Sequence, residues 1–314
     1  MPATSAPQRV VVTGATGLLG QALVPQLVAA GAAVTRLTRR PGAAPAGPGV
    51  TDSRWDPAAG TIDARALEGA DAVVHLAGET VAERWTTAHK HAIRESRMRG
   101  TRLLAESIAR LERWPAVLVS ASATGIYGDG GDRLLTEDGP PATDFLGTVA
   151  REWEEATAPA RDAGIRVAIT RFGMILSPDG GALARLLPPF RMGGGGKIGD
   201  GRQWMPWIAR DDAVGAVRHL IATEAARGPV NVVAPAPVRN AEFAETLAHV
   251  LHRPALMTVP AFALRLMFGE MADAVLLISQ RVSGARLAAL GYACRWPTLE
   301  AALRHELRAE VAAA

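Results

Sequence analysis

The segment RVVVTGATGLLG, residues 9–20, constrains the fold of this chain more than any other. A β-branched run leads directly into Gly14, Gly17 and Gly20, and a helical pattern follows. The first glycine permits a tight turn, the second lets the backbone approach a pyrophosphate, and the third lets the helix pack on the strand. The N-terminus of that helix offers free N–H groups and a positive dipole to phosphates. The segment predicts a dinucleotide-binding turn.

Runs rich in β-branched and apolar residues recur along the first half of the chain: RVVVTG, AAVTRLTR, ADAVVHLAG, AVLVSAS and IRVAITRFG. Continuous apolar runs of this length are typical of parallel strands that are buried on both faces. Helical patterns over residues 17–31, 85–111 and 145–164 separate them, and the first and last end in a glycine placed as a C-cap. These repeated units predict an α/β fold with a doubly wound parallel sheet, the Rossmann architecture.

The pattern changes after Gly173. Residues 192–207, MGGGGKIGDGRQWMPW, predict a glycine-rich loop without regular structure. A helix over about 211–225 and a strand at 228–235 are expected to return to the main sheet, and two or three helices follow Arg239. We predict two domains: a nucleotide-binding domain over 9–173 that is completed by about 208–235, and a smaller lid or substrate domain over 174–207 and 236–307.

Charge and cysteine usage disfavour several classes of partner. The formal net charge is +3, and the arginines are scattered without a basic block, which disfavours nucleic-acid binding. Cys294 is the single cysteine, so we expect no disulfide and no Cys/His metal site, as in a reducing compartment. We find no secretory signal in MPATSAPQ and no apolar run near the ~18 residues of a membrane span. We expect a cytoplasmic, bacterial protein without a membrane partner; its oligomeric state stays open, with a homodimer as one option.

The end of the second predicted strand discriminates between two nicotinamide cofactors. An acidic residue there binds the adenosine ribose 2′-hydroxyl, whereas an arginine suits a 2′-phosphate. The sequence has Thr38, Arg39 and Arg40 at this place and no carboxylate. It therefore favours NADP(H) over NAD(H), with two solvated loop arginines as the alternative interpretation.

The segment HLAGE ends the ADAVVHLAG run. Its residues Leu76, Ala77 and Gly78 are small enough for a nucleotide to lie over the backbone. His75, directly before them, is expected to belong to the core rather than to a catalytic site.

Together these motifs resemble the extended short-chain dehydrogenase/reductase superfamily, and more narrowly its atypical branch of "epimerase family" proteins with a distinctive C-terminal domain. The resemblance covers about residues 9–307 and includes TGATGLLG, LTRRP, WDP, LAGE, RWT, IRESR, SASATGIYGD, WEEATAPA, GGALARLLPPFRMGGGGKIGDGRQWMPWI, GPVNVVAPAPVRNAEF and RPALMTVPA. It implies a Rossmann domain, NADP as the cofactor and a small-molecule substrate.

The resemblance also implies cofactor contacts residue by residue. Arg97 stands where typical members carry an asparagine, and a cation there could face the phosphates or the substrate, with a helix-surface arginine as the alternative. Ile175 would pack against the nicotinamide end. The full set of predicted contacts is Gly14, Ala15, Thr16, Gly17, Leu18, Leu19, Thr38, Arg39, Arg40, Leu76, Ala77, Gly78, Arg97, Ser120 and Ile175.

The segment DFLGTVAREWEE departs from the family at the catalytic positions. Typical members carry Tyr-x-x-x-Lys here, and the tyrosine passes a proton. This chain has Phe145 and Val149 instead. Ser122 matches the family serine that polarises a substrate oxygen, and Tyr127 is the candidate proton donor, with a structural role in lining the pocket as the alternative. We predict Ser122 and Tyr127 as the catalytic residues.

The second half of the chain offers two further expectations. Trp204 and Trp207 could pave an apolar substrate site or fasten the lid to the sheet. Asp211 or Asp212 is expected to be the N-cap of the following helix.

Two functions fit this sequence. The first is an NADP(H)-dependent oxidoreductase or epimerase-like enzyme that acts on an unidentified small carbonyl or hydroxyl compound. The second is a non-catalytic NADP(H)-binding regulatory or interaction protein, for example in division, in which the cofactor stabilises one conformation of the lid. Losing a positioned acid costs about 10²–10⁴-fold in rate, which a slow reaction tolerates, so the missing pair leaves both open.

Overall fold

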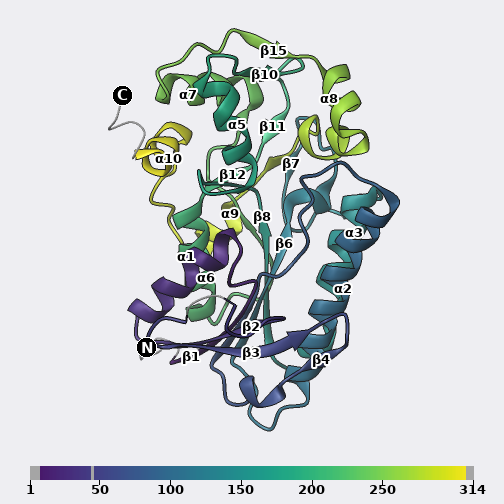
Figure 1. Ribbon diagram of the computed structural model, residues 1–314, viewed down its shortest axis with the longest axis vertical. Coiled ribbons are helices and arrows are strands. Elements are labelled where there is room, and N and C mark those ends of the chain that lie inside the picture. Colours follow the sequence, from purple (N-terminus) through teal and green to yellow (C-terminus); the bar gives the residue numbers. More distant parts are fainter. Residues whose placement is uncertain (1–7, 44–45, 309–314) are drawn as a thin grey trace.

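The computed structural model describes residues 8–43 and 46–308 and has a twisted sheet at its centre (Figure 1). The strands are β1 Arg9–Thr13, β2 Ala33–Thr38, β3 Val50–Asp56, β4 Thr61–Ile62, β5 Ala72–His75, β6 Val117–Ala123, β7 Leu134–Leu135, β8 Arg166–Phe172, β9 Met174–Leu176, β10 Gly196–Ile198, β11 Trp204–Met205, β12 Trp207–Ala209, β13 Gly228–Val232, β14 Val238–Arg239, β15 Met257–Val259 and β16 Arg281–Val282. The helices are α1 Leu18–Ala29, α2 Thr87–Ala109, α3 Phe145–Glu155, α4 Ala158–Asp162, α5 Gly181–Arg191, α6 Arg210–Ala222, α7 Asn240–Val250, α8 Ala261–Phe268, α9 Ala285–Ala289 and α10 Leu299–Glu306, with the short turns η1 Ala64–Ala66, η2 Thr124–Tyr127 and η3 Ala272–Leu276.

The central sheet has eight strands in the order β13-β8-β6-β5-β1-β2-β3-β4. Neighbouring strands are parallel except for the β3–β4 pair at one edge. The chain leaves β1 toward β2 and β3, then crosses back to β5 on the other side of β1. Ligands of open α/β sheets bind where the strand order reverses in this way, outside the carboxyl ends of the strands. The predicted doubly wound fold is confirmed.

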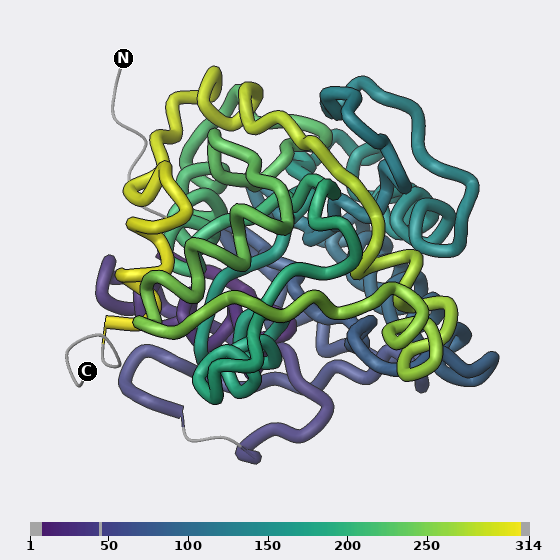
Figure 2. Tube along the Cα trace, turned by 90° about the horizontal axis from the view of Figure 1, so that it is seen from above, coloured from purple at the N-terminus to yellow at the C-terminus, as the bar shows by residue number. Residues whose placement is uncertain are grey.

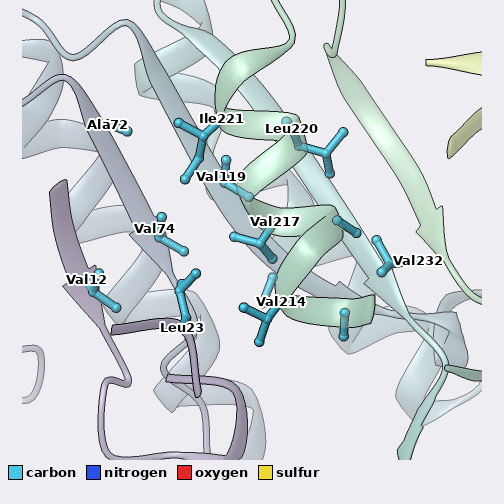
Figure 3. Packing of buried hydrophobic residues seen from close by; sticks show 14 of the residues in the cluster. Val12, Leu23, Ala72, Val74, Val119, Val214, Val217, Leu220, Ile221 and Val232 are labelled. Atoms are coloured by element: carbon cyan, nitrogen blue, oxygen red, sulfur yellow. The ribbon is translucent and has the colours of Figure 1, made fainter. Parts of the chain in front are cut away.

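Helices cover both faces of the sheet (Figure 1). Helices α1 and α6 pack on one face, and α2 and α4 pack on the other. Figure 3 shows the α6 side chains Val214 and Val217 facing Val74 and Val119 of the sheet. Because burying a Val or Leu side chain contributes roughly 1.5–3 kcal/mol, this packing makes the sheet a rigid base for the turns at its carboxyl end.

A second hydrophobic cluster lies beyond the carboxyl end of the sheet. It joins α5, α7, α10 and the strands β9 and β12. We call these segments, together with β10, β11 and the segment from α8 to η3, the lid. Figure 2, which looks down from above, shows these green-to-yellow segments lying over the end of the sheet. The exact domain boundaries stay a prediction. No helix of the described residues is long and apolar enough to cross a membrane.

Three sequence predictions are wrong in detail. Strand β3 was not among the five expected runs, because polar residues alternate along it near the sheet edge. The helix expected over 145–164 is two helices, since Pro159 has no N–H to continue the first one. The loop expected over 192–207 contains β10 and β11, which pair with β15 and β14 from later in the chain.

The prediction for the start of α6 is also wrong. Ala209 is the N-cap, and Asp211 and Asp212 both lie in the first turn. Asp212 is fully buried, and its carboxylate accepts hydrogen bonds from the Tyr292 hydroxyl at 3.1 Å and from the backbone N–H groups of residues 295–296 at 2.8 and 3.1 Å. This carboxylate therefore anchors the C-terminal segment instead of capping its own helix.

Candidate functional site

The β1–α1 turn approaches the end of β5 closely. Gly14 has a φ of 67°, and a Cβ atom there would lie 2.6 Å from the carbonyl carbon of Leu76. A Cβ atom at Gly20 would lie 2.3 Å from the carbonyl oxygen of Gly14. Only glycine fits at these two positions. Gly17 is the N-cap of α1, whose first turn holds no acidic residue, so its N–H groups and dipole remain available to an anion.

A cavity of about 450 Å³ opens at this turn, where the strand order reverses. It runs from the end of β2 and β3, past the β1–α1 turn, to the end of β5. Ten of the predicted cofactor residues line it: Gly14, Ala15, Thr16, Gly17, Thr38, Arg39, Arg40, Leu76, Ala77 and Gly78.

The β2 end of the cavity is electropositive. Arg39 and Arg40 are exposed there, and neither side chain has a carboxylate partner in the described part of the chain. On neighbouring β3, the carboxylate of Asp52 also lines the cavity, and Arg36 binds it through bonds of 2.7 and 3.1 Å. The Arg36 hydrogen bond holds the pKa of Asp52 below its usual value, and Gly42 N–H adds a further bond at 2.9 Å. Because its charge is neutralised, Asp52 does not repel a phosphate beside Arg39.

The wall also holds an unsatisfied donor. The indole N–H of Trp55 is buried and has no hydrogen-bond partner among the described residues. Backbone N–H groups, two arginines and this indole all suit acceptor-rich ligands. The residues present therefore fit a phosphorylated dinucleotide.

Five predicted cofactor residues do not line this cavity: Leu18, Leu19, Arg97, Ser120 and Ile175. Leu19 and Ile175 pack against the main core, and Ser120 is buried within β6. Their contact with the cofactor stays a prediction.

Arg97 lies beside the cavity although it does not form its wall. Its guanidinium lies 3.4 Å from the position that a Cβ atom of Gly78 would take, and 4.9 Å from the Trp153 ring. One N–H donates to the Ile93 carbonyl oxygen at 3.1 Å. Burial lowers the pKa of Arg97 to about 10, partly opposed by the charge of Glu79. Arg97 is therefore an inward-facing cation rather than a helix-surface arginine.

Ser122 and Tyr127 belong to a buried polar network. Ser122 Oγ donates to Glu154 Oε1 at 2.7 Å, and Tyr127 donates to Asn231 Oδ1 at 2.6 Å. Arg171 binds both oxygens of Glu154 at 2.8 Å and donates to the Tyr127 hydroxyl at 2.9 Å. Burial raises the pKa of Tyr127.

This network links β6, β8 and β13 to α3. Both hydroxyl protons are held by protein acceptors, an arrangement that agrees with the structural alternative for Tyr127. The catalytic roles of Ser122 and Tyr127 stay a prediction. His75, expected in the core, is buried between the Thr13 hydroxyl at 2.7 Å and the Thr101 hydroxyl at 2.8 Å.

Helix α3 presents no proton-exchanging side chain at the family's catalytic positions. It begins at Phe145, where the Asp144 carboxylate caps it by accepting from Gly147 N–H at 2.7 Å. Val149 is buried. The ring of Phe145 packs edge-on against Trp85, with 5.1 Å between the centroids.

The two lid tryptophans differ. Trp207 is fully buried and donates its indole N–H to the Ala236 carbonyl oxygen at 3.0 Å, so it fastens the lid. Trp204 is half-buried; it donates to Asp132 at 2.8 Å and lies under the Arg239 guanidinium at 4.4 Å. Neither forms an open apolar platform.

Sequence reasoning missed part of the cavity wall. Asp52, Trp55 and Pro57 come from β3 and its end, and Ser96 and Arg99 come from α2. In the sequence, the Trp-Asp-Pro segment of residues 55–57 carries only the family resemblance. Its place at the end of β3 is what brings Trp55 and Pro57 to the carboxyl edge of the sheet.

Comparisons with known proteins agree with this geometry. Residues 10–233 match the model of the NAD dependent epimerase/dehydratase family, and residues 259–306 match a domain of unknown function, DUF1731. An epimerase family protein of Mycobacterium bovis is 41% identical over 295 residues, which cover 94% of this chain and 96% of that protein.

Solved structures are similar over nearly the whole chain. The crystal structure of human epimerase family protein SDR39U1 with NADPH has a TM-score of 0.86 and 34% identity, and the match covers 96% of this chain and 99% of that one. A nucleoside-diphosphate sugar epimerase from Corynebacterium glutamicum has a TM-score of 0.78 and 40% identity over 96% of this chain and 59% of that one. The chain therefore belongs to the NAD-dependent epimerase/dehydratase family, in the group of epimerase family proteins that carry a C-terminal DUF1731 domain.

Proposed function

We infer that this protein is an NADP(H)-dependent oxidoreductase or epimerase that acts on a small carbonyl or hydroxyl compound. The observation that carries this proposal is the cavity at the strand-order reversal, whose β2 end holds two arginines with no carboxylate partner among residues 8–43 and 46–308. The NADPH in the similar human structure supports the choice of cofactor.

The chain's own residues would divide the cofactor between them. The backbone N–H groups of the Gly14–Gly17 turn and the start of α1 would bind the pyrophosphate. Arg39 and Arg40 would bind the 2′-phosphate, because a guanidinium pairs with a phosphate through two parallel bonds. The nicotinamide, when bound, supplies or accepts a hydride. Arg97 extends from α2 and adds a positive charge beside Gly78.

This proposal requires a side chain that donates a proton to the substrate oxygen, and neither Ser122 nor Tyr127 is well placed to do so. Ser122 keeps lone pairs with which it could contact a substrate, but its own proton is directed to Glu154. Tyr127 is held between Asn231 and Arg171, and its raised pKa disfavours release of its proton. A proton donor outside this network would remove the difficulty.

The closed network also favours a second candidate function. If Ser122 and Tyr127 are purely structural and Phe145 and Val149 are inert, the protein could bind NADP(H) without turnover, as a regulator or interaction protein. In that case the closed position of the lid over the bound cofactor would be the state that a partner protein recognises.

Binding and turnover separate the two candidates. Calorimetry with NADPH and NADP⁺ measures binding, and the decay of NADPH absorbance measures turnover with a panel of aldehydes, ketones, quinones and a nucleoside-diphosphate sugar. Binding with turnover supports the enzyme. Binding without turnover across the panel supports the regulator, and no binding of either form contradicts both.

Cofactor preference gives a sharper test. Arg39→Asp should lower the NADP(H)-to-NAD(H) affinity ratio by roughly 10- to 100-fold, since a hydrogen bond to a charged group contributes roughly 1.5–3 kcal/mol. Arg218→Asp makes the same charge change on the exposed face of α6, outside the cavity wall, and should leave the ratio unchanged. An unchanged ratio in Arg39→Asp would defeat the 2′-phosphate assignment.

A further inference from the structure

One of the two lysines of the chain lies over the aromatic ring that replaces the family tyrosine. Lys90 Nζ is 4.4 Å from the centroid of the Phe145 ring and 5.9 Å from that of Trp85. It also binds both carboxylate oxygens of Glu270 at 2.8 and 3.0 Å. The Lys90 side chain is 31% exposed, so solvent can still reach it.

The position of Lys90 on α2 places it near the cofactor. Lys90, Ile93 and Arg97 are spaced so that they share one face of the helix. Ile93 is buried against the body of the protein, and Arg97 lies beside Gly78 of the cavity wall. Lys90 therefore lies on the inward face two turns before Arg97, about 10 Å farther toward the lid.

The direction of the cofactor puts its reactive end on this side. A dinucleotide straddles the point at which the strand order reverses. Arg39 marks the adenosine side, at β2, so the nicotinamide half belongs on the other side of β1, over β5 and β6. Helix α2 follows β5, and α3 follows β6. Lys90 and Phe145 stand at the starts of these two helices.

We propose that Lys90 is the proton donor of this protein, in place of the tyrosine that Phe145 replaces. The proposal rests on the enzyme function proposed above, with the reduced nicotinamide as the hydride source. When a carbonyl compound is reduced, one N–H bond of the Lys90 ammonium breaks and an O–H bond forms on the substrate oxygen. The neutral amine then regains a proton from water, and oxidation of an alcohol runs the same transfer in reverse.

Glu270 is the positioning residue for this ammonium. A lysine ammonium has three N–H donors, and the contacts with Glu270 occupy at most two. Glu270 precedes η3 in the lid region, and Arg84 Nη1 also joins α8 by donating to the Leu266 carbonyl oxygen at 3.3 Å. Figures 1 and 2 both show yellow-green α8 beside the blue start of α2. The donor is thus held in place when these two segments are together.

The same contacts have a purely structural interpretation, in which Lys90 and Glu270 only hold the lid against the start of α2. Substitutions separate this role from proton donation. Lys90→Met removes both the charge and the proton. Lys90→Arg keeps a cation that can pair with Glu270, but a guanidinium does not give up its proton. Arg84→Ala breaks another contact between the same two segments, and Lys197→Met repeats the lysine change in β10 of the lid.

The first readout is independent of activity. With only Lys90 and Lys197 in the chain, reductive dimethylation with isotope-labelled formaldehyde gives two lysine signals in an NMR spectrum. The signal missing from Lys90→Arg identifies Lys90. We expect NADPH to move the Lys90 signal and to leave that of Lys197 in place. A Lys90 signal that NADPH does not move would overturn the proposal.

The second readout is turnover of NADPH with the carbonyl panel. Lys90→Met and Lys90→Arg should both lower kcat by about 10²–10⁴-fold while calorimetry shows retained NADPH binding. Arg84→Ala and Lys197→Met should behave like the parent protein. Full activity of Lys90→Arg would show that residue 90 only holds the lid against α2, and it would overturn the proton-donor role. If the parent protein binds NADPH but reduces nothing in the panel, the enzyme function itself fails, which differs from a failure specific to Lys90.

Discussion

His75 shows how a polar side chain becomes a core residue in this fold. It is completely buried, and each ring nitrogen has a threonine hydroxyl as its partner, Thr13 or Thr101. Trp55 packs edge-on against the imidazole, with 5.8 Å between the centroids. A neutral ring satisfies all of these contacts, but a charged one would be desolvated. Burial accordingly lowers the pKa of His75 to about 4.

This lowered pKa makes the stability of the fold depend on pH. Below its ordinary pKa of 6.5, His75 takes up a proton in the unfolded chain but not in the folded one, so stability falls as the pH falls. Between pH 6.5 and pH 4 the loss should approach about 3 kcal/mol. The free energy of unfolding in urea, measured for the parent and for His75→Gln between pH 6.5 and pH 4, isolates the effect. The same dependence on pH in both proteins would contradict it.

At the level of elements, helix α3 depends on one buried ion pair. Arg171 and Glu154 are only 7% and 12% exposed, and the bonds to Glu154 raise the pKa of Arg171 although burial opposes its charge. Losing one partner would leave the other charge buried without compensation, which is far more costly than losing a surface pair.

Glu154→Gln should therefore destabilise the protein by about 3–5 kcal/mol. The neighbouring Glu155 forms an exposed pair with Arg151 at 3.0 Å, so Glu155→Gln should change the free energy of unfolding by no more than about 0.5 kcal/mol. Denaturant titrations of both variants provide the comparison. Equal, small effects would show that the buried network is dispensable for stability.

The elements also show what can be predicted from sequence. The glycine turn was predictable because Gly14 and Gly20 meet steric limits that no other residue satisfies. The central strands, which lie buried between two layers of helices, were predictable from their continuous apolar runs. Strand β3 was not, because an edge-proximal strand needs no such run.

The same limit applies to the candidate site. Arginines that follow β2 can be placed from the order of the elements, and ten predicted residues do meet in one cavity. The pairing of Arg36 with Asp52, the Ser122–Glu154 bond and the position of Lys90 over Phe145 depend on side chains from different elements. Nothing local in the sequence encodes such long-range contacts.

At the scale of the whole molecule, Asp212 ties the last part of the chain to α6. Removing its carboxylate in Asp212→Ala takes away the acceptor of the backbone N–H groups of Arg295 and Trp296, whereas the Tyr292 hydroxyl keeps the backbone oxygen of residue 212 at 2.9 Å. Each hydrogen bond to a charged group contributes roughly 1.5–3 kcal/mol, so we expect a destabilisation of about 3 kcal/mol or more. Asp162→Ala, at an exposed position, is the matched control.

Cys294 reports on this anchoring directly. It is the only cysteine, and burial together with Asp212 raises the pKa of its thiol to about 11. A thiol reagent should thus modify the parent protein slowly and Asp212→Ala much faster. Equal rates would mean that the carboxylate does not hold this segment.

The position of β13 has a consequence for synthesis. This strand lies at the edge of the main sheet beside β8, yet the chain builds β9 to β12 before it. During synthesis, the apolar face of the sheet around Val119 therefore stays exposed to solvent until α6 and β13 have emerged from the ribosome. A nascent chain stalled before Val232 would offer that face to chaperones, whereas a full-length one would not.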